Sequence, residues 1–146
     1  MVIVTSNVRE MTAVLSQDQR EYLSAHQWAV LATTRRDGSP QQSLVAYALD
    51  PAGRIIVSTK AYAAKWHNAV RQPNVSLAIL EGRSHLVLYG IAEPVADDPE
   101  RAELTADVFS RLVGGPRPDP ASLVPNLDDQ QRTILRITPL KAVFHD

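Results

Sequence analysis

The sequence predicts a mainly β protein with some α structure: a small closed barrel of six or seven antiparallel, Greek-key-like strands with short flanking helices. Short apolar segments recur along the 146 residues, separated by clusters of Gly, Pro, Asp and Asn, which is typical of strands joined by turns. Strands joined by tight turns pair antiparallel. Helical segments are few, and strands do not alternate with helices as they do in a parallel doubly wound sheet.

The first predicted element is a short helix that leads into a buried strand. Ser16 and Gln19 have the spacing of a capping box, which predicts a helix through about His26. Residues 28–34 (WAVLATT) form an apolar run bounded by polar residues, as expected of a buried strand.

Two turns then fold the chain into a three-stranded meander. The Asp37-Gly38 pair is a hairpin signal, and it predicts that residues 41–49 pair back on the first strand. A second turn leads into a third strand at residues 54–58.

A helix and two more strands are expected after the meander. Residues 61–71 are Ala-rich and stop before Pro73, which predicts a helix. We expect strands at residues 75–80 and 85–95, with a bulge at Gly90.

The last part of the chain predicts one helix, a loop and a final strand pair. Acidic residues and Pro99 begin a helix that runs to about Val113 and stops at a glycine pair. Residues 116–125 are Pro-rich and predict a loop without core residues. Strands are expected at residues 133–138 and 141–145.

The composition fits a single domain over residues 1–146 and excludes several functions. The 16 acidic residues nearly balance the 15 basic ones, whereas general nucleic-acid or membrane-surface binders usually have a basic excess. The absence of cysteine excludes disulfides, thiol catalysis and cysteine-based zinc sites. Residues 1–13 are expected to form a loose tail without the pattern of a signal peptide. No segment is apolar enough to cross a membrane, so we expect a cytoplasmic protein.

No motif for catalysis by protein side chains is present. The chain has no G-x-S-x-G nucleophile motif, no Rossmann or P-loop glycine pattern, and no metal-ligating spacing among its four histidines. The paired acids at residues 97–98 and 128–129 fit helix starts or loops better than acid–base catalysis. We therefore predict neither a catalytic side chain nor a metal site.

One cluster of polar side chains remains, where a strand is expected to give way to a helix. It consists of Ser58, Thr59, Lys60 and Lys65. Helix starts attract anions, because free backbone N–H groups and the helix dipole favour negative charge. The residues alone leave two interpretations open: a phosphate cradle with charge-assisted hydrogen bonds, or hydroxyls that cap the helix beside solvated lysines.

An ordered series of short motifs bears on this choice. The motifs are Leu31-Ala32-Thr33, Asp37-Gly38-Ser39-Pro40, Ser58-Thr59, Lys65, His67 and Pro73-Asn74-Val75-Ser76-Leu77. With these motifs in this order, the chain resembles the FMN-binding split-barrel family of pyridoxamine 5′-phosphate oxidase-like proteins, over about residues 16–95 and the terminal strand pair. The resemblance implies a split-barrel fold, a homodimer, and a flavin-like cofactor in a groove between the subunits.

Two departures from the family pattern concern the cofactor. The FMN-dependent oxidases usually carry an Arg-Lys pair on the helix, where this chain has Ala64-Lys65. They also end in a tail that binds the substrate phosphate, whereas this chain ends RITPLKAVFHD. The chain therefore resembles more closely the actinobacterial branch that uses the deazaflavin coenzyme F-420, and the Ala/Arg-rich composition is consistent with that branch.

The resemblance also implies which residues bind the cofactor. Its phosphate would lie against Ser58, Thr59, Lys60 and Lys65, and its ring against the strand that carries Gln41, Ser43 and Val45. The ring carries the hydride in such proteins, so the expected function is an F-420-dependent reductase of a small unsaturated organic substrate. The alternatives are an FMN-binding oxidoreductase of the same fold and a non-catalytic protein that binds flavin or haem. We also expect the loop at residues 114–126 to cover or line the site.

Overall fold

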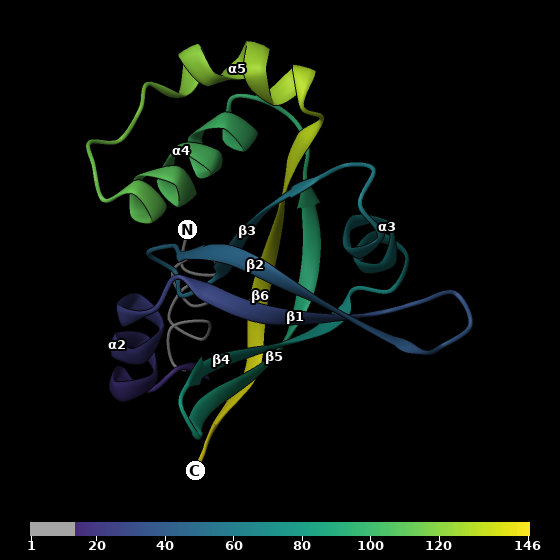
Figure 1. The fold of residues 1–146 in the computed structure, drawn as a ribbon, viewed down its shortest axis with the longest axis vertical. Helices are drawn as coiled ribbons and strands as arrows, with labels where there is room; N and C mark the ends of the chain where they lie inside the picture. The colour runs from purple at the N-terminus through teal and green to yellow at the C-terminus, as the bar shows by residue number, and fades with distance from the viewer. Residues whose placement is uncertain (1–13) are drawn as a thin grey trace, which may run out of the picture.

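The computed structural model describes residues 14–146 and confirms the predicted barrel (Figure 1). Six antiparallel strands close in the order β1-β2-β3-β6-β5-β4. The strands are β1 (Trp28–Thr34), β2 (Pro40–Leu49), β3 (Ile55–Lys60), β4 (Asn74–Glu81), β5 (Ser84–Val95) and β6 (Arg132–His145). The helices are α2 (Gln17–Ala25), α3 (Ala64–Arg71), α4 (Glu100–Val113) and α5 (Pro120–Asp129). The tail predicted for residues 1–13 lies outside the described residues, and none of the described helices is long and apolar enough to cross a membrane.

Buried and more exposed side chains alternate along the strands, and the buried ones give the barrel an apolar interior. Leu31, Val57, Leu77, Leu88 and Ile137 come from five different strands and are almost fully buried in one cluster. Burying each such side chain contributes about 1.5–3 kcal/mol. The intervening residues of each strand point to the outer surface, where helices or ligands can cover them.

The helix α2 packs onto this core and begins at the predicted capping box. Ser16 Oγ accepts the Gln19 backbone N–H at 3.1 Å, and Gln19 Oε1 accepts the Ser16 N–H at 2.9 Å. Leu23 is fully buried in the core, and the Tyr22 hydroxyl donates to the Ile79 carbonyl oxygen at 2.9 Å. These contacts fix α2 on the barrel.

The bulge predicted at Gly90 is confirmed, and it explains why β6 continues through Pro139. The β5–β6 register shifts just before Gly90, which lies opposite Pro139. A Cβ atom on Gly90 would lie 2.6 Å from the Thr138 carbonyl oxygen, so glycine permits the close approach of the two strands. The missing N–H of the proline falls at this irregularity. The strands predicted at residues 133–138 and 141–145 therefore form one strand.

The helix α4 lies on the outer surface of the barrel, and α5 packs on α4 (Figure 1). Val108 of α4 is buried with Ile56 and Ile134 in a second apolar cluster. The guanidinium of Arg101 fixes the two helices to each other. It lies 2.8 Å from a carboxylate oxygen of Asp98, just before α4, and 2.7 Å from a carboxylate oxygen of Asp128 in α5.

The loop predicted at residues 116–125 is confirmed only for residues 116–119, because Pro120–Asp129 forms α5. The Asp119 carboxylate accepts the Ala121 N–H, and proline stands at the first helical position. A proline there is compatible with a helix, since that position has no intrahelical N–H bond to lose. Of the prolines that favoured a loop, Pro120 marks a helix start and Pro125 lies inside the helix.

Candidate functional site

A groove of about 480 Å³ lies between α4 and the outer surface of the barrel. Strands β1, β2 and β3, the start of β6, α4 and the turn before α3 contribute to its walls. The residues that line it are Trp28, Leu44, Val45, Ala46, Ser58, Thr59, Lys60, Tyr62, Ala63, Lys65, Val108, Phe109, Leu112 and Arg132. Part of this lining is cationic and polar, and part is apolar and aromatic.

The geometry of β3 and β6 brings the polar groups of the groove together. Val57 faces the core, so the alternation of the strand turns Ser58 and Lys60 to the outer surface. Lys60 is the cross-strand partner of Arg132 at the start of β6. Arg132 Nη1 donates to Ser58 Oγ at 3.3 Å. Two cations and a hydroxyl therefore share one surface.

The groove is electropositive. Lys60, Lys65 and Arg132 line it, and no acidic side chain of residues 14–146 does. Within residues 14–146, none of these three cations forms an ion pair with a carboxylate. Lys60 Nζ lies 5.6 Å from the ring centroid of Tyr62. Cations gathered without a counter-ion repel one another, so the arrangement favours an anionic ligand.

Thr59 adds a polar atom that the protein itself leaves unpaired. Its side chain is only 2% exposed, and its Oγ1 is buried without a hydrogen-bond partner within residues 14–146. An unpaired buried hydroxyl costs about 1–3 kcal/mol. Thr59 lies on the same core-facing side of β3 as Val57, so it lines the inner wall of the groove, and its hydroxyl is a candidate donor to an anion bound there.

The remaining lining is suited to a flat organic ring. Trp28 and Leu44 of the barrel are 51% and 67% exposed, and Phe109 and Leu112 of α4 are half-buried opposite them. Large exposed apolar side chains around a hollow are typical of ligand or partner sites. The groove thus combines an anion-binding part with an apolar part.

The structure brings together most of the residues predicted to bind a cofactor. Ser58, Thr59, Lys60, Lys65 and Val45 all line the groove.

Gln41 and Ser43 do not line the groove. Gln41 Oε1 instead accepts a hydrogen bond from Asn68 Nδ2 at 2.8 Å, and Ser43 is paired with Leu31 in the ladder with β1. Both lie on the same side of β2 as Val45, but nearer the β1–β2 turn, beyond the stretch Leu44–Ala46 that lines the groove.

The alternative role of Ser58 and Thr59 as helix caps is wrong. The strand β3 extends through Lys60, and α3 begins only at Ala64. Its N-cap, Ala63, makes no side-chain hydrogen bond. The two hydroxyls are strand residues, which leaves them available to a ligand.

Sequence reasoning missed Arg132, Phe109 and Leu112. The strand pairing that brings Arg132 beside Lys60 is a long-range contact. The one sequence signal for it was an arginine next to the expected start of a strand. The groove is covered by α4, and none of residues 114–126 lines it.

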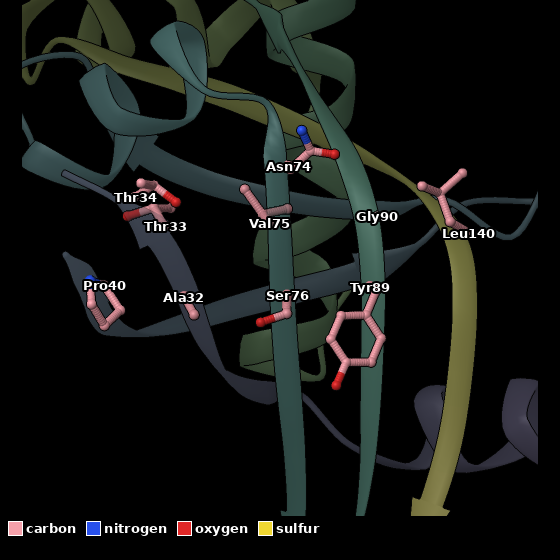
Figure 2. Close-up of a pocket in the computed structure, with 10 residues that line it drawn as sticks. All are labelled: Ala32, Thr33, Thr34, Pro40, Asn74, Val75, Ser76, Tyr89, Gly90 and Leu140. Atoms are coloured by element: carbon pink, nitrogen blue, oxygen red, sulfur yellow. The ribbon is translucent and has the colours of Figure 1, made fainter. Parts of the chain in front are cut away.

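A second hollow of about 360 Å³ lies on the outer surface of β1, β4 and β5. Figure 2 shows Ser76 and the ring of Tyr89 side by side on adjacent strands, with Leu140 of β6 beyond them. No charged side chain lines this hollow. Tyr89 and Leu140 are 48% and 59% exposed, so this surface is neutral and partly apolar.

A third hollow, of about 740 Å³, adjoins the groove, since Tyr62 lines both. Arg35 and Arg36 of the β1–β2 turn and Arg71 of α3 contribute to it, with one acidic residue, Asp37. Arg71 is held in place by a 2.6 Å hydrogen bond to the Thr34 carbonyl oxygen. The cationic character of the groove therefore continues along α3.

Comparisons with known proteins agree with this architecture. The family model described as pyridoxamine 5′-phosphate oxidase matches residues 15–146. Among curated proteins, none matches the chain. A conserved hypothetical protein of Mycobacterium tuberculosis has a similar structure, with 26% identity and a TM-score of 0.76 over 91% of this chain and 86% of that chain.

Two further solved structures share the fold. One is named an F420 reductase, with 20% identity and a TM-score of 0.67 over 88% of this chain and 98% of that chain. The other is the heme storage protein HutZ of Vibrio cholerae, with 19% identity and a TM-score of 0.62 over 90% of this chain and 93% of that chain. At these identities the likeness concerns the fold, which carries different functions.

Proposed function

The chain belongs to the pyridoxamine 5′-phosphate oxidase family, and from that premise we propose that it is an oxidoreductase that binds coenzyme F-420 in the groove beneath α4. It transfers a hydride between this cofactor and a small unsaturated organic substrate. The observation that carries the proposal is a cluster of three cations that form no ion pair with any described residue, together with one buried hydroxyl that has no described partner, beside an apolar, aromatic wall.

The lining residues fit a phosphate joined to a flat ring. Lys60, Lys65 and Arg132 supply positive charge, and Ser58 and Thr59 supply hydroxyl donors. Charge-assisted hydrogen bonds of this kind are about twice as strong as neutral ones. The ring would lie against the apolar part of the groove, where the exposed barrel residues face α4.

The protein's part in the reaction is binding, orientation and exclusion of water. When bound, the deazaflavin ring supplies the hydride chemistry. Phe109 and Leu112 of α4 cover the apolar part and keep water from it, while the cations fix the phosphate. No side chain with an acid–base role is required by this scheme, in keeping with the absence of a catalytic motif in the sequence.

Two observations favour F-420 over FMN. Ala64 stands where the FMN-dependent oxidases usually carry the arginine of an Arg-Lys pair. In addition, FMN ends at its phosphate, whereas F-420 continues into a tail of glutamate carboxylates. The adjoining cationic hollow with Arg35, Arg36 and Arg71 offers these carboxylates a surface.

An FMN-dependent oxidoreductase is the second candidate, because the matching family model carries the name of an FMN enzyme. A haem-binding protein is less well supported. Of the described residues that line the groove, none is a histidine, cysteine or methionine, and Tyr62 is the one side chain of a type that ligates haem iron.

We further propose that the protein is a homodimer. A row of apolar side chains crosses five neighbouring strands on the outer surface that no described helix covers: Leu44, Val30, Ala78, Val87 and Val143. An antiparallel sheet that faces water would carry polar residues there, so a second copy of the chain is expected to cover this row. Trp28 and Leu44 connect the row to the groove.

A charge placed in this row tests the dimer. Val87→Glu should convert a dimer to a monomer in light scattering coupled to size exclusion. Val113→Glu, at an 83% exposed position at the end of α4, is the control and should leave the mass unchanged. A monomeric wild-type protein would contradict the dimer.

Turnover tests the activity. The purified protein should oxidise reduced F-420 in the presence of quinone- or enone-type acceptors, followed by the return of the oxidised deazaflavin absorbance. The Lys60→Ala/Lys65→Ala double variant, which removes two of the groove's cations, should lose this activity at the same cofactor concentration. Tight F-420 binding with no turnover across a broad acceptor panel would refute the enzyme and leave a cofactor-binding protein.

A further inference from the structure

Two histidines face each other across β5 and β6. His145 ends β6, whereas Arg132, which lines the groove, begins it, and Figure 1 shows the two ends of β6 on opposite sides of the barrel. His85 is the cross-strand partner of His145. Their ring centroids lie 5.1 Å apart, and the ring planes differ by only 17°. We propose that this pair is a binding site for a divalent transition-metal ion of the zinc, nickel or copper type, separate from the cofactor groove.

The ring separation matches a metal chelate. A metal ion about 2.0–2.1 Å from a ring nitrogen lies about 3.2 Å from that ring's centroid, so ligand angles of about 90–109° place two centroids about 4.5–5.2 Å apart. The observed 5.1 Å falls within this range. The rings stack in the structure, and the His85 ring is held by its Nδ1 contact with the Arg83 carbonyl oxygen. The His145 ring therefore has to turn about its second side-chain torsion to bring both lone pairs to a common ion.

The hydrogen bonding of His85 prepares one nitrogen for the metal. Nδ1 of His85 lies 3.0 Å from the carbonyl oxygen of Arg83. A carbonyl oxygen only accepts, so Nδ1 carries the proton and Nε2 keeps its lone pair. Metal-ligating histidines usually hold their second ring nitrogen in this way. Within residues 14–146, the His145 ring makes no hydrogen bond that would compete for its nitrogens.

The chemistry of the donors selects the class of ion. Two neutral imidazoles favour zinc, copper and nickel over magnesium and calcium, which prefer oxygen ligands. No cluster of three or more potential ligating side chains occurs in the described part of the chain, so water completes the coordination. Asp146 follows His145, and its Oδ1 lies 3.5 Å from Ser84 Oγ.

Calorimetric titration of the metal-stripped protein without a polyhistidine tag tests the site, with Ni²⁺ and Zn²⁺ as probes. We expect one ion per chain, and an affinity that falls at least about tenfold in His85→Gln and in His145→Gln. His67→Gln, which removes an imidazole of α3 outside the β5–β6 histidine pair, is the matched control and should bind as the wild type does. A Cu²⁺ electron paramagnetic resonance spectrum with nitrogen hyperfine splitting would identify the ligands independently.

Thermal unfolding with and without metal is a second test, because two histidines that only stack would give no metal-dependent rise in Tm. At a metal concentration about a hundredfold above Kd, the wild-type Tm should rise by about 5–10 °C, because the ion joins the ends of two strands. The double variant His85→Gln/His145→Gln should show no rise. The proposal is overturned if this double variant binds the ion as tightly as the wild type. It is also overturned if the wild type shows no saturable binding below about 100 µM.

Discussion

Replacing Lys65 by alanine should weaken binding of the cofactor phosphate without destabilising the fold. Lys65 lies in the first turn of α3, lines the groove, and forms no ion pair with any described residue. A lysine near a helix N-terminus opposes the helix dipole, and alanine is the better helix former. The free energy of unfolding should therefore change by no more than about 0.5 kcal/mol.

The loss of affinity follows from the hydrogen bond that Lys65 would make. A hydrogen bond to a charged group contributes about 1.5–3 kcal/mol, which corresponds to an increase in Kd of about 10- to 150-fold. Lys65 is half-buried, so solvent screens part of this interaction and the lower half of the range is expected. Added salt should narrow the difference between wild type and variant.

The assay is a fluorescence titration of F-420 against wild type, Lys65→Ala and a matched lysine control. Among the chain's three lysines, Lys141 lies on β6 opposite Tyr89, away from the groove. Lys141→Ala should bind as the wild type does. Equal affinity of wild type and Lys65→Ala would refute the assignment of this groove as the phosphate site.

Three further substitutions test the site and the fold. Thr59→Val removes an unpaired buried hydroxyl, so it should leave the cofactor-free protein as stable or up to about 1 kcal/mol more stable in urea, while F-420 affinity falls several-fold; a variant that loses stability without losing affinity would contradict a ligand role. Gly90→Ala places a Cβ atom 2.6 Å from the Thr138 carbonyl oxygen and should cost about 1–3 kcal/mol, measured by urea denaturation. The hydrogen bond from Arg101 lowers the pKa of Asp98. The ionised Asp98 carboxylate therefore stabilises the folded protein fully above the unfolded pKa of about 3.9, and this contribution is lost as the pH falls through the lower folded pKa. Asp98→Asn should accordingly lose less stability than wild type between pH 5 and pH 2, and parallel pH profiles would disprove this contribution.

Local sequence signals predicted most of the fold. The apolar run at residues 28–34, the Asp37-Gly38 turn and the capping box at Ser16 each depend on neighbouring residues, and each is confirmed. Gly90 marked the bulge correctly because a missing side chain permits close backbone approach. The helix α5 was missed because proline favours both loops and helix starts, and only tertiary packing on α4 decides between them.

The candidate site was predicted only where its residues are close in sequence. Ser58, Thr59, Lys60 and Lys65 lie within two adjacent elements, and one groove contains them all. Arg132 joins the site because it pairs with Lys60, which lies 72 residues earlier in the chain (132 minus 60). No local pattern encodes that pairing, nor the placement of α4 over the groove.

A side-by-side titration of the purified protein with F-420 and FMN tests the central claim most directly. If the groove is a deazaflavin site, F-420 should bind with micromolar or tighter affinity and at least about tenfold more tightly than FMN, a difference of about 1.4 kcal/mol. F-420 lacking its glutamate tail should bind more weakly than the complete cofactor, since the adjoining arginines would lose their carboxylate partners. Tighter binding of FMN than of F-420, or saturable binding of neither, would contradict the assignment.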